Sequence, residues 1–538
     1  MPIFSSECPA ILIPKVDVYS FLFDSPAFAA KAHHRAVVDL ADASTYTYAE
    51  IKDRVHRLAA GLHRQGFEKG HVLAVYAQNA LDYPTVLFAV LKVGGIVSPA
   101  NPTYTPDELA YQLKDARANF LVTQSDLLHD ALLAASAAGI HKDRIFLISR
   151  KGQQGFHGLD DVLTDGLSPH VPLTGDAAAA AVAYLCYSSG TTGRSKGVMT
   201  SHYNIVANVC QVLAFESDYG PGDVWMGFLP FYHIYALTWI LHVSIAKGIS
   251  VLVMKRFDLL QYLEAVQTYR VTHVHCAPPV AIQMAKNPLV TKYNLKSIRM
   301  LICAAAPLSA QVAQEVYDKT NIPIKQAYGM TEASPISHVS PNDNIIVASC
   351  GKLVPNMEAR IVSVDTKQDL GIGEEGELWL RGPNIMLGYH NNHEATRNTI
   401  TSDGWLMTGD IGKVDGQGNY YITDRLKELI KVKGFQVAPA DLEALLLTHP
   451  GIADAAVIGV PDPYSDQVPK AFVVPKPDAT LSSEQVMSYV EGKVAPHKRL
   501  KGGVELIHAI PRNPSGKILR RDLRALEVQR RAAVAAKL

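Results

Sequence analysis

The chain has 538 residues, of which 48% are hydrophobic and 19% are charged, so it is a globular protein large enough for about two to four domains. Its 51 Lys and Arg residues balance its 51 Asp and Glu residues, and this zero formal charge gives no support for a nucleic-acid-binding protein, which carries a basic excess. The six cysteines form no C-x-x-C metal or redox pattern and imply no disulfide framework, so a reducing compartment is favoured.

Neither a leader nor a membrane span is expected. The first seven residues carry no basic stretch ahead of an apolar run, so the chain shows no secretory signal. The most apolar segment, Leu237–Met254, contains His242, Ser244 and Lys247. It is therefore interpreted as buried helix and strand rather than as a span.

Residues 36–150 alternate helix and strand signals. Thr47 and Glu50 have the spacing of a capping box and predict a helix that stops at Gly66. Val72–Tyr76 is a strand candidate, and Phe120–Val122 is another. Thr105, followed by Pro106 and by Glu108, opens a helix between them. This alternation predicts a parallel sheet.

A glycine- and hydroxyl-rich loop follows the apolar run Ala181–Cys186, which has strand character. Its hydroxyls, glycine N–H groups and one lysine can surround an anion, so it is interpreted as a phosphate-binding loop, with an ordinary flexible surface loop as the alternative. The spacing is not that of a Walker loop. The residues expected to bind phosphate are Ser188, Ser189, Gly190, Thr191, Thr192, Gly193 and Lys196.

The pattern changes again after the middle of the chain. Helix and strand signals run from residue 201 to 336, and short β runs broken by glycine from 350 to 421 suggest a small β subdomain. Four cations then cluster within Asp424–Gly434, which is interpreted as a domain boundary. Beyond it, Ala456–Val460 and Ala471–Val474 suggest a βαβ-like segment.

The last residues contain a possible targeting signal. Arg530–Ala533 supports a terminal helix, and Ala536-Lys537-Leu538 differs from the peroxisomal Ser-Lys-Leu signal by one small residue. This tail predicts a peroxisomal import receptor as a partner and the peroxisome as the location, with the cytoplasm as the alternative.

Five motifs taken together resemble the acyl-adenylate-forming superfamily and, within it, the 4-coumarate:CoA ligase-like group. The motifs are Ser188–Gly197, Tyr328–Glu332, Gly404–Asp410, Asp424–Gln436 and Pro511–Lys517. The resemblance implies an α/β fold: a large N-terminal region over residues 1–424, with two β/α sheets and a small β subdomain, a hinge at 425–427, and a small mobile α+β domain over 428–538.

The resemblance also implies a reaction in two halves. A carboxylate attacks the α-phosphorus of ATP to give acyl-AMP and diphosphate, and the thiol of coenzyme A then displaces AMP. Two unit charges 4 Å apart repel by about 4 kcal/mol at an effective dielectric of 20, so the first half needs cations and N–H donors already in place. ATP, Mg²⁺ and coenzyme A are the cofactors and co-substrates expected.

The resemblance assigns roles around the nucleotide. Thr331 is expected to contact the α-phosphate, and Glu332 to hold Mg²⁺ through an oxygen ligand. Asp410 is expected to anchor the ribose with help from Arg425, and Tyr328 to stack on adenine; taken alone, Asp410 could equally be a turn residue and Tyr328 a core aromatic. The other residues expected at the nucleotide are Ala305, Ala306, Gln326, Lys427 and Lys431.

Lys517 is the lysine that the resemblance places between the substrate carboxylate and the α-phosphate. Lys427 is expected to be the hinge residue, and rotation there would withdraw Lys517 and bring Lys433 and Gly434 to the CoA channel. Arg256 matches a CoA-phosphate contact, and its neighbour Lys255 could assist or be an ordinary surface charge.

The acyl pocket is expected at the start of a helix. His233 would gate or orient the acid, although it could also be a core histidine, and Tyr235 and Trp239 share one face at i,i+4 spacing. The other residues expected in the walls are Ala304, Gly329, Pro335, Ile336 and Gln436. Trp239 and Ala304 are bulkier than the residues that coumarate ligases usually have there.

The expected substrate is an aryl acid similar to 4-coumarate, cinnamate or benzoate, and the added bulk favours a short one. A medium- or long-chain fatty acid that passes the tryptophan remains an alternative. A luciferase-like oxygenase, an adenylation module that feeds a carrier protein, and an inactive scaffold are further alternatives. The Phe231–Ile234 motif, the end of the chain soon after Lys517 and the intact key positions favour the ligase.

Overall fold

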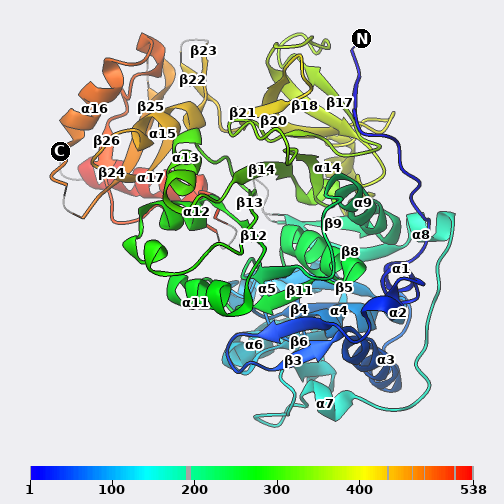
Figure 1. Ribbon diagram of the computed structural model, residues 1–538. Helices are drawn as coiled ribbons and strands as arrows, with labels where there is room; N and C mark the ends of the chain where they lie inside the picture. Colours follow the sequence, from blue (N-terminus) through cyan, green and yellow to red (C-terminus); the bar gives the residue numbers. More distant parts are fainter. Residues whose placement is uncertain are drawn as a thin grey trace.

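The computed structural model describes residues 2–188, 195–432, 435–462, 464–477, 479–513 and 516–535. Two large sheets and a smaller antiparallel sheet form the N-terminal region, and a fourth sheet belongs to a small C-terminal domain, which lies beside α12 and α13 (Figure 1). The expected mixed α/β architecture is confirmed.

The first large sheet has the strand order β19-β9-β8-β5-β4-β6-β7. Its strands are β4 (Val72–Tyr76), β5 (Ile96–Ala100), β6 (Ala118–Thr123), β7 (Ile145–Leu147), β8 (Val182–Ser188), β9 (Lys196–Ser201) and β19 (Gly388–Tyr389). Strands β4 to β8 are parallel, and β9 pairs antiparallel with β8, so the predicted phosphate-binding loop connects the two strands of a hairpin.

The helices of this part of the chain include the two that the sequence predicts, which begin after Thr47 and after Thr105. The helices here are α3 (Tyr48–Arg64), α4 (Tyr83–Lys92), α5 (Pro106–Asp115), α6 (Leu128–Ala138) and α7 (Leu159–Val162). The predicted capping box of Thr47 with Glu50 forms on α3, and the predicted helix start at Thr105 forms a second one with Glu108 on α5, because each box satisfies N–H groups that a helix start leaves free. Helix α7 has only four residues.

The second large sheet has the order β16-β15-β14-β13-β12-β10-β11-β2-β3, and it is parallel from β14 to β2. Its strands are β2 (Arg35–Asp39), β3 (Thr45–Thr47), β10 (Val224–Gly227), β11 (Ser250–Val253), β12 (His273–Cys276), β13 (Met300–Cys303), β14 (Ile324–Gly329), β15 (Ile336–Val339) and β16 (Lys352–Leu353). The helices of this part of the chain are α9 (His202–Phe215), α10 (Val243–Lys247), α11 (Leu259–Tyr269), α12 (Pro278–Lys286) and α13 (Ala310–Thr320).

The apolar segment Leu237–Met254 lies inside the protein. It forms most of a π-helical turn η3 (Ala236–His242), then α10 and β11. No helix among the described residues has the length and apolar character needed to cross a membrane.

The predicted β subdomain is an antiparallel sheet in the order β1-β17-β18-β20-β21. Its strands are β1 (Phe4–Ser5), β17 (Glu358–Val362), β18 (Gly376–Arg381), β20 (Leu406–Val414) and β21 (Tyr420–Arg425). The remaining short helices are α1 (Val18–Phe23), α2 (Phe28–Lys31), α8 (Asp176–Ala180), α14 (His393–Arg397), η1 (Ser125–Leu127), η2 (Lys142–Arg144), η4 (Pro288–Lys292), η5 (Thr331–Ala333) and η6 (Pro496–Lys498).

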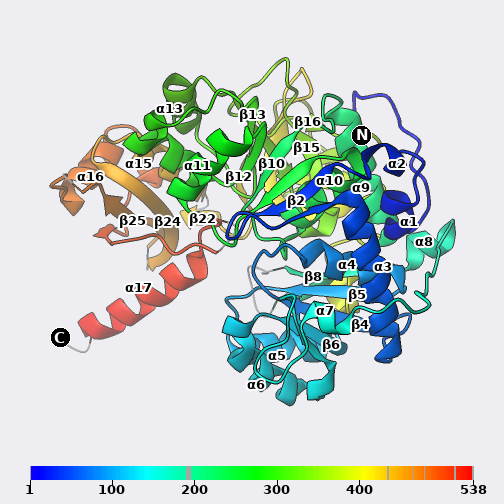
Figure 2. The ribbon, with the colours of Figure 1, turned by 60° about the horizontal axis from the view of Figure 1, so that its bottom comes forward.

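The small domain contains β22 (Ile430–Val432), β23 (Phe435–Val437), β24 (Ile452–Asp462), β25 (Asp466–Pro475), β26 (Val504–Leu506), α15 (Pro439–Leu447), α16 (Ser483–Glu491) and α17 (Arg520–Ala535). Its main apolar cluster, from Ile430 to Leu500, is separate from the large cluster that ends at Tyr420. Helix α17 confirms the predicted terminal helix; it packs on β24 through Leu523 and points away from the N-terminal region (Figure 2).

One prediction about this domain was wrong. The runs 456–460 and 471–474 do not form a βαβ unit, because β24 and β25 pair antiparallel as a hairpin. Only ten residues separate the two runs, which is fewer than a parallel crossover needs. The parallel crossover in this domain runs instead from β25 through α16 to β26.

Candidate active site

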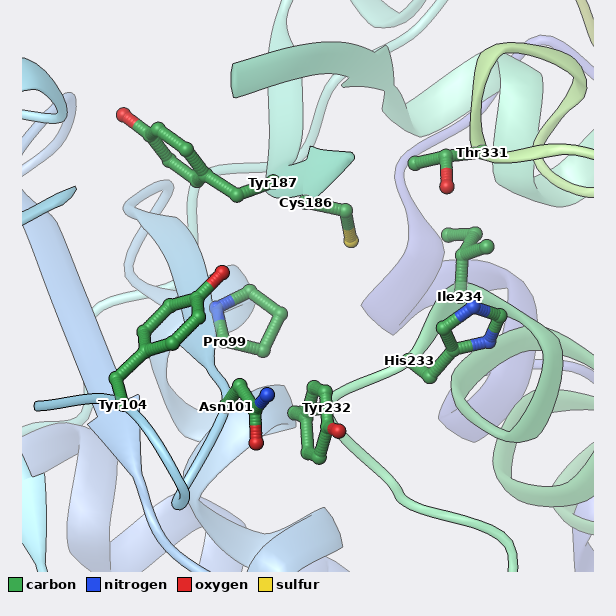
Figure 3. Close-up of a pocket in the computed structure, with 9 residues that line it drawn as sticks. All are labelled: Pro99, Asn101, Tyr104, Cys186, Tyr187, Tyr232, His233, Ile234 and Thr331. Carbon is green, nitrogen blue, oxygen red and sulfur yellow. The ribbon is translucent and has the colours of Figure 1, made fainter. Parts of the chain in front are cut away.

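A cavity opens where the two large sheets meet, at the carboxyl ends of their parallel strands, the usual ligand position in open α/β sheets. Figure 3 shows Asn101 and Tyr104, which follow β5, on one side, and His233 and Thr331 on the other. The residues that line it are Pro99, Asn101, Tyr104, Cys186, Tyr187, Tyr232, His233, Ile234 and Thr331.

Asp410 lies at the centre of a buried polar group. It is 3% exposed and is paired with Arg425 across the β20–β21 ladder. The Tyr328 hydroxyl donates to its Oδ2 at 2.6 Å, and Nε of Arg425 lies 2.9 Å from its Oδ1. Burial and the Asp410 charge raise the pKa of Tyr328, so its hydroxyl stays protonated as a donor. Three residues predicted at the nucleotide are thus in direct contact.

Glu332 forms a second group beside the predicted phosphate-binding loop. Its buried side chain accepts a hydrogen bond from the Tyr389 hydroxyl at 2.8 Å, and the Lys196 ammonium lies 4.1 Å from the centroid of the Tyr389 ring. Burial lowers the pKa of Lys196, and the Glu332 charge opposes this shift. Tyr389 thus holds the predicted metal ligand next to the loop lysine.

The donor set fits Mg²⁺ that is bound with a nucleotide. Among the residues that the structure describes, no three His, Cys, Asp or Glu side chains are grouped in a way that could hold a metal alone. Mg²⁺ in nucleotide enzymes uses one or two carboxylates and completes its shell with phosphate oxygens and water. Glu332 can supply such a carboxylate.

Lys517 enters the same site from the small domain. Burial, and then the Arg425 charge, lower the pKa of Lys517 to about 8, while Glu428 and Asp410 oppose the shift. Its neighbour Gly516 packs on the carboxyl end of β12, where an added Cβ would lie 3.0 Å from the Cβ of Ala277. Burial and the charge of Lys517 also lower the pKa of His233 to about 4, so that histidine is neutral. The structure therefore brings Lys517 together with the nucleotide residues of the large region.

Aromatic side chains form a wall next to His233. The Tyr235 hydroxyl lies 3.2 Å from Nδ1 of His275 on β12. Trp239 is fully buried, and its ring centroid lies 5.8 Å from that of Tyr235 and 5.0 Å from that of His275. The predicted shared face of Tyr235 and Trp239 forms, although their helix is a π-helix.

The opposite predicted wall is set by close backbone contact. A Cβ added at Gly329 would lie 2.2 Å from the carbonyl oxygen of Pro335. Ile336 and Ala304 are buried, and the N–H of Ala304 donates to the carbonyl of Cys276 at 3.1 Å. This wall has no room for a side chain at position 329.

Other predicted residues lie at the edge of the site or away from it. Arg256 is exposed, and so is Lys255, which pairs with Asp126 at 2.8 Å. Lys427 and Lys431 are exposed, and the charge of Lys427 helps to lower the pKa of Lys196. Ser188 is the last residue of β8, Ala305 is exposed and Ala306 is half-buried. The side-chain amide of Gln326 forms hydrogen bonds with the backbone of Leu308 and Val347.

Several predicted residues cannot be placed. Ser189, Gly190, Thr191, Thr192 and Gly193, as well as Lys433 and Gly434, lie outside the described residues, and so does the side chain of Gln436. Their predicted contacts with phosphate, coenzyme A and the acyl group stay predictions.

Sequence reasoning missed Tyr389, Asn101 and Tyr104. Asn101 and Tyr104 directly follow β5, and the rule that ligands bind at the carboxyl ends of parallel strands could have found them. No local signal marks Tyr389, because β19 reaches Glu332 only through its long-range pairing with β9.

Known proteins match most of this chain. Residues 25–390 match the family model of AMP-binding enzymes, and residues 441–517 match the C-terminal domain of those enzymes. The chain is 38% identical over 537 residues to the probable 4-coumarate–CoA ligase 1 of Dictyostelium discoideum, with 97% of each chain covered. It is 37% identical to 4-coumarate–CoA ligase 1 of Petroselinum crispum, over 97% of this chain and 96% of the relative.

Solved structures give the same result. ATP-bound MatB from Rhodopseudomonas palustris is 28% identical with a TM-score of 0.86, over 96% of this chain and 99% of the other. The o-succinylbenzoate CoA synthetase of Bacillus subtilis, in complex with its acyl-adenylate, is 25% identical with a TM-score of 0.79, over 95% and 98%. The fold and the site define an adenylate-forming enzyme, and the chain belongs to the AMP-binding enzyme family. Within that family it is an ATP-dependent acyl-CoA synthetase, which joins a carboxylic acid to coenzyme A through an acyl-AMP intermediate.

Proposed function

We propose that this acyl-CoA synthetase acts on a short aryl acid of the benzoate, cinnamate or 4-coumarate class. The observation that carries the proposal is the buried wall of Tyr235, Trp239 and His275 next to His233. Flat rings stack well on aromatic side chains, and Trp239, which is fully buried beside Tyr235, would limit the depth of an acyl pocket at this wall. The names of the curated relatives support the same class.

The residues then divide the chemistry between the two regions. The loop between β8 and β9 holds the β- and γ-phosphates, Asp410 anchors the ribose, and Lys517 lies between the incoming carboxylate and the α-phosphate. Glu332 holds Mg²⁺, which supplies charge neutralisation at the phosphates when it is bound. Neutral His233 orients the acid, because an imidazole without charge does not trap the carboxylate in an ion pair.

The second half-reaction needs a different arrangement of the small domain. It turns about residues 425–427 and withdraws Lys517 after acyl-AMP has formed. Coenzyme A then enters past Arg256, and its thiol attacks the acyl carbon, forming the thioester as AMP leaves. The half-buried position of Lys517 close to Arg425 and Asp410 and the exposed position of Arg256 support this order of events.

One assay tests the substrate. AMP release and loss of CoA thiol are measured with benzoates, cinnamates, 4-coumarate and C6–C18 fatty acids, with Mg²⁺ and with EDTA. The best aryl acid should exceed the best fatty acid about 10-fold or more in kcat/KM, the range that pocket contacts supply, and EDTA should stop turnover. A preference for fatty acids would establish the fatty acyl-CoA alternative, and light emission with a luciferin in air would establish the oxygenase.

The tail Ala536-Lys537-Leu538 supports a second proposal, import into peroxisomes, since it differs from a peroxisomal signal by one residue. A fluorescent fusion that ends in the native tail should collect in peroxisomes, and removal of the last three residues should leave it in the cytoplasm. Equal distributions of the two fusions would rule out the signal.

A further inference from the structure

Helix α15 of the small domain has no N-terminal cap from its own N-cap residue. The residue at its N-cap is Ala438, which has no side-chain acceptor, and Pro439 follows it. The N–H of Ala440 donates instead to Oδ2 of Asp424 at 3.1 Å. Asp424 is 7% exposed and lies on β21 of the large region. The proposed hinge, residues 425–427, separates Asp424 from α15, so this cap crosses the hinge.

Buried ion pairs connect α15 to the active-site lysine. Glu443 on α15 accepts two hydrogen bonds from the Arg520 guanidinium, at 2.7 and 2.8 Å. The same guanidinium donates to Glu428 at 2.7 Å, and all three side chains are close to 10% exposed. Arg520 begins α17, three residues after Lys517. Because these bonds lie within the small domain, α15 and Lys517 keep their relative positions when the domain moves.

We propose that Asp424 is a positioning residue for acyl-AMP formation: its cap on α15 holds the small domain where Lys517 reaches the active site. The cap bond breaks when the domain turns for thioester formation, since its donor and its acceptor lie on opposite sides of the hinge. This inference rests on the proposed function, in which the small domain rotates about residues 425–427.

The surroundings of Asp424 agree with this role. Burial raises the pKa of Asp424 to about 7, although the N–H groups of Arg425 and Ala440 and the Arg520 charge oppose the shift. The carboxyl group is therefore withdrawn from water in this arrangement of the domains. Both its ionised and its neutral form present an oxygen that accepts from Ala440. An asparagine at this position keeps that acceptor.

The test separates the two half-reactions in the full-length enzyme. Diphosphate release without CoA reports acyl-AMP formation, and CoA thiol loss with supplied acyl-AMP reports the second half. Asp424→Ala should slow the first about three- to fivefold, the value expected for loss of one helix cap, and leave the second within about twofold. Asp424→Asn should stay within about twofold of the parent in both.

Two further variants keep the result decisive. Ala440→Pro removes the donor in the first turn of α15, where proline is tolerated, and should reproduce the selective loss even if Asp424→Ala does not fold. Asp441→Ala is the control. Asp441 lies in the same turn of α15, but its carboxylate pairs with Lys498 inside the small domain, at 2.8 Å, so this variant should change neither half-reaction.

Equal slowing of both half-reactions by Asp424→Ala and Ala440→Pro would overturn the inference, because the cap would then only stabilise the fold. A selective slowing of acyl-AMP formation in Asp441→Ala would also overturn the inference, since any weakening of α15 would then slow this half-reaction. A failure of the proposed function would give a different result, because the Lys517→Ala variant would then form acyl-AMP at the rate of the parent enzyme.

Discussion

Replacement of Lys517 by alanine should reduce acyl-AMP formation about 100- to 1000-fold and spare most of the second half-reaction. The first half brings a carboxylate up to a phosphate, and loss of one pre-placed donor at such a transition state has an effect of this size. Lys517 is half-buried, and the charges of Arg425, Glu428 and Asp410 act on it, so alanine would leave this position without its cation. Diphosphate release without CoA, and thioester formation from supplied acyl-AMP, measure the two effects. Equal losses in both would contradict the assignment.

The pH profile provides a second readout of the same lysine. Its pKa in the free enzyme is lowered to about 8, so the ammonium is present below pH 8 and is lost as the pH rises through that value. The kcat/KM of acyl-AMP formation reports the free enzyme and should fall above pH 8. Lys517→Arg, which keeps its charge, should remove that decline even where its rate at neutral pH is lower. A decline that persists in the arginine variant would assign the titration to another group.

Replacement of Trp239 by alanine should change both stability and substrate choice. The side chain is fully buried against Tyr235 and His275, so its removal should lower the free energy of unfolding by about 3–5 kcal/mol. The space that it leaves should admit a longer or more substituted ring. The ratio of kcat/KM for 4-coumarate to that for benzoate should therefore rise about 10-fold or more. Thermal or denaturant unfolding and an acid panel measure the two parts.

Trp405→Ala is the matched control for this prediction. Trp405 is 2% exposed but lies in the β subdomain, where its ring faces Arg360 and Arg381. It should lose a similar amount of stability and leave the relative kcat/KM values across the panel unchanged. An unchanged panel in Trp239→Ala would remove Trp239 from the acyl pocket, whatever its effect on stability.

Local features of the fold could be predicted from the sequence. The capping boxes at Thr47 and Thr105 formed, because a cap depends on residues within one helical turn. Strand β4 has the predicted bounds, Val72–Tyr76, and all five of its residues are buried, as its apolar run indicates. The family motifs also indicated which distant segments would meet, and Lys517 does lie with Asp410 and Arg425.

Features that depend on long-range pairing could not be predicted in this way. The pairing of β24 with β25 is different, because it is a local hairpin: the ten residues between the two apolar runs are too few for a parallel crossover, so their spacing could have given the antiparallel direction. Tyr389 reaches Glu332 only through the pairing of β19 with β9. The cap from Asp424 to Ala440 joins residues 16 positions apart on two sides of the proposed hinge, and a search for caps next to α15 finds only Ala438.

The tight contact at Gly329 limits how this enzyme can be re-engineered. Even an alanine there would place its Cβ 2.2 Å from the carbonyl oxygen of Pro335, so the backbone would have to move before a side chain at this position could contact the acid. Randomised libraries that include position 329 should return mostly inactive clones. Variation at 239 and 304 changes side chains that already exist, so an evolving lineage can adjust the acid that it accepts from these two positions and not from the glycine.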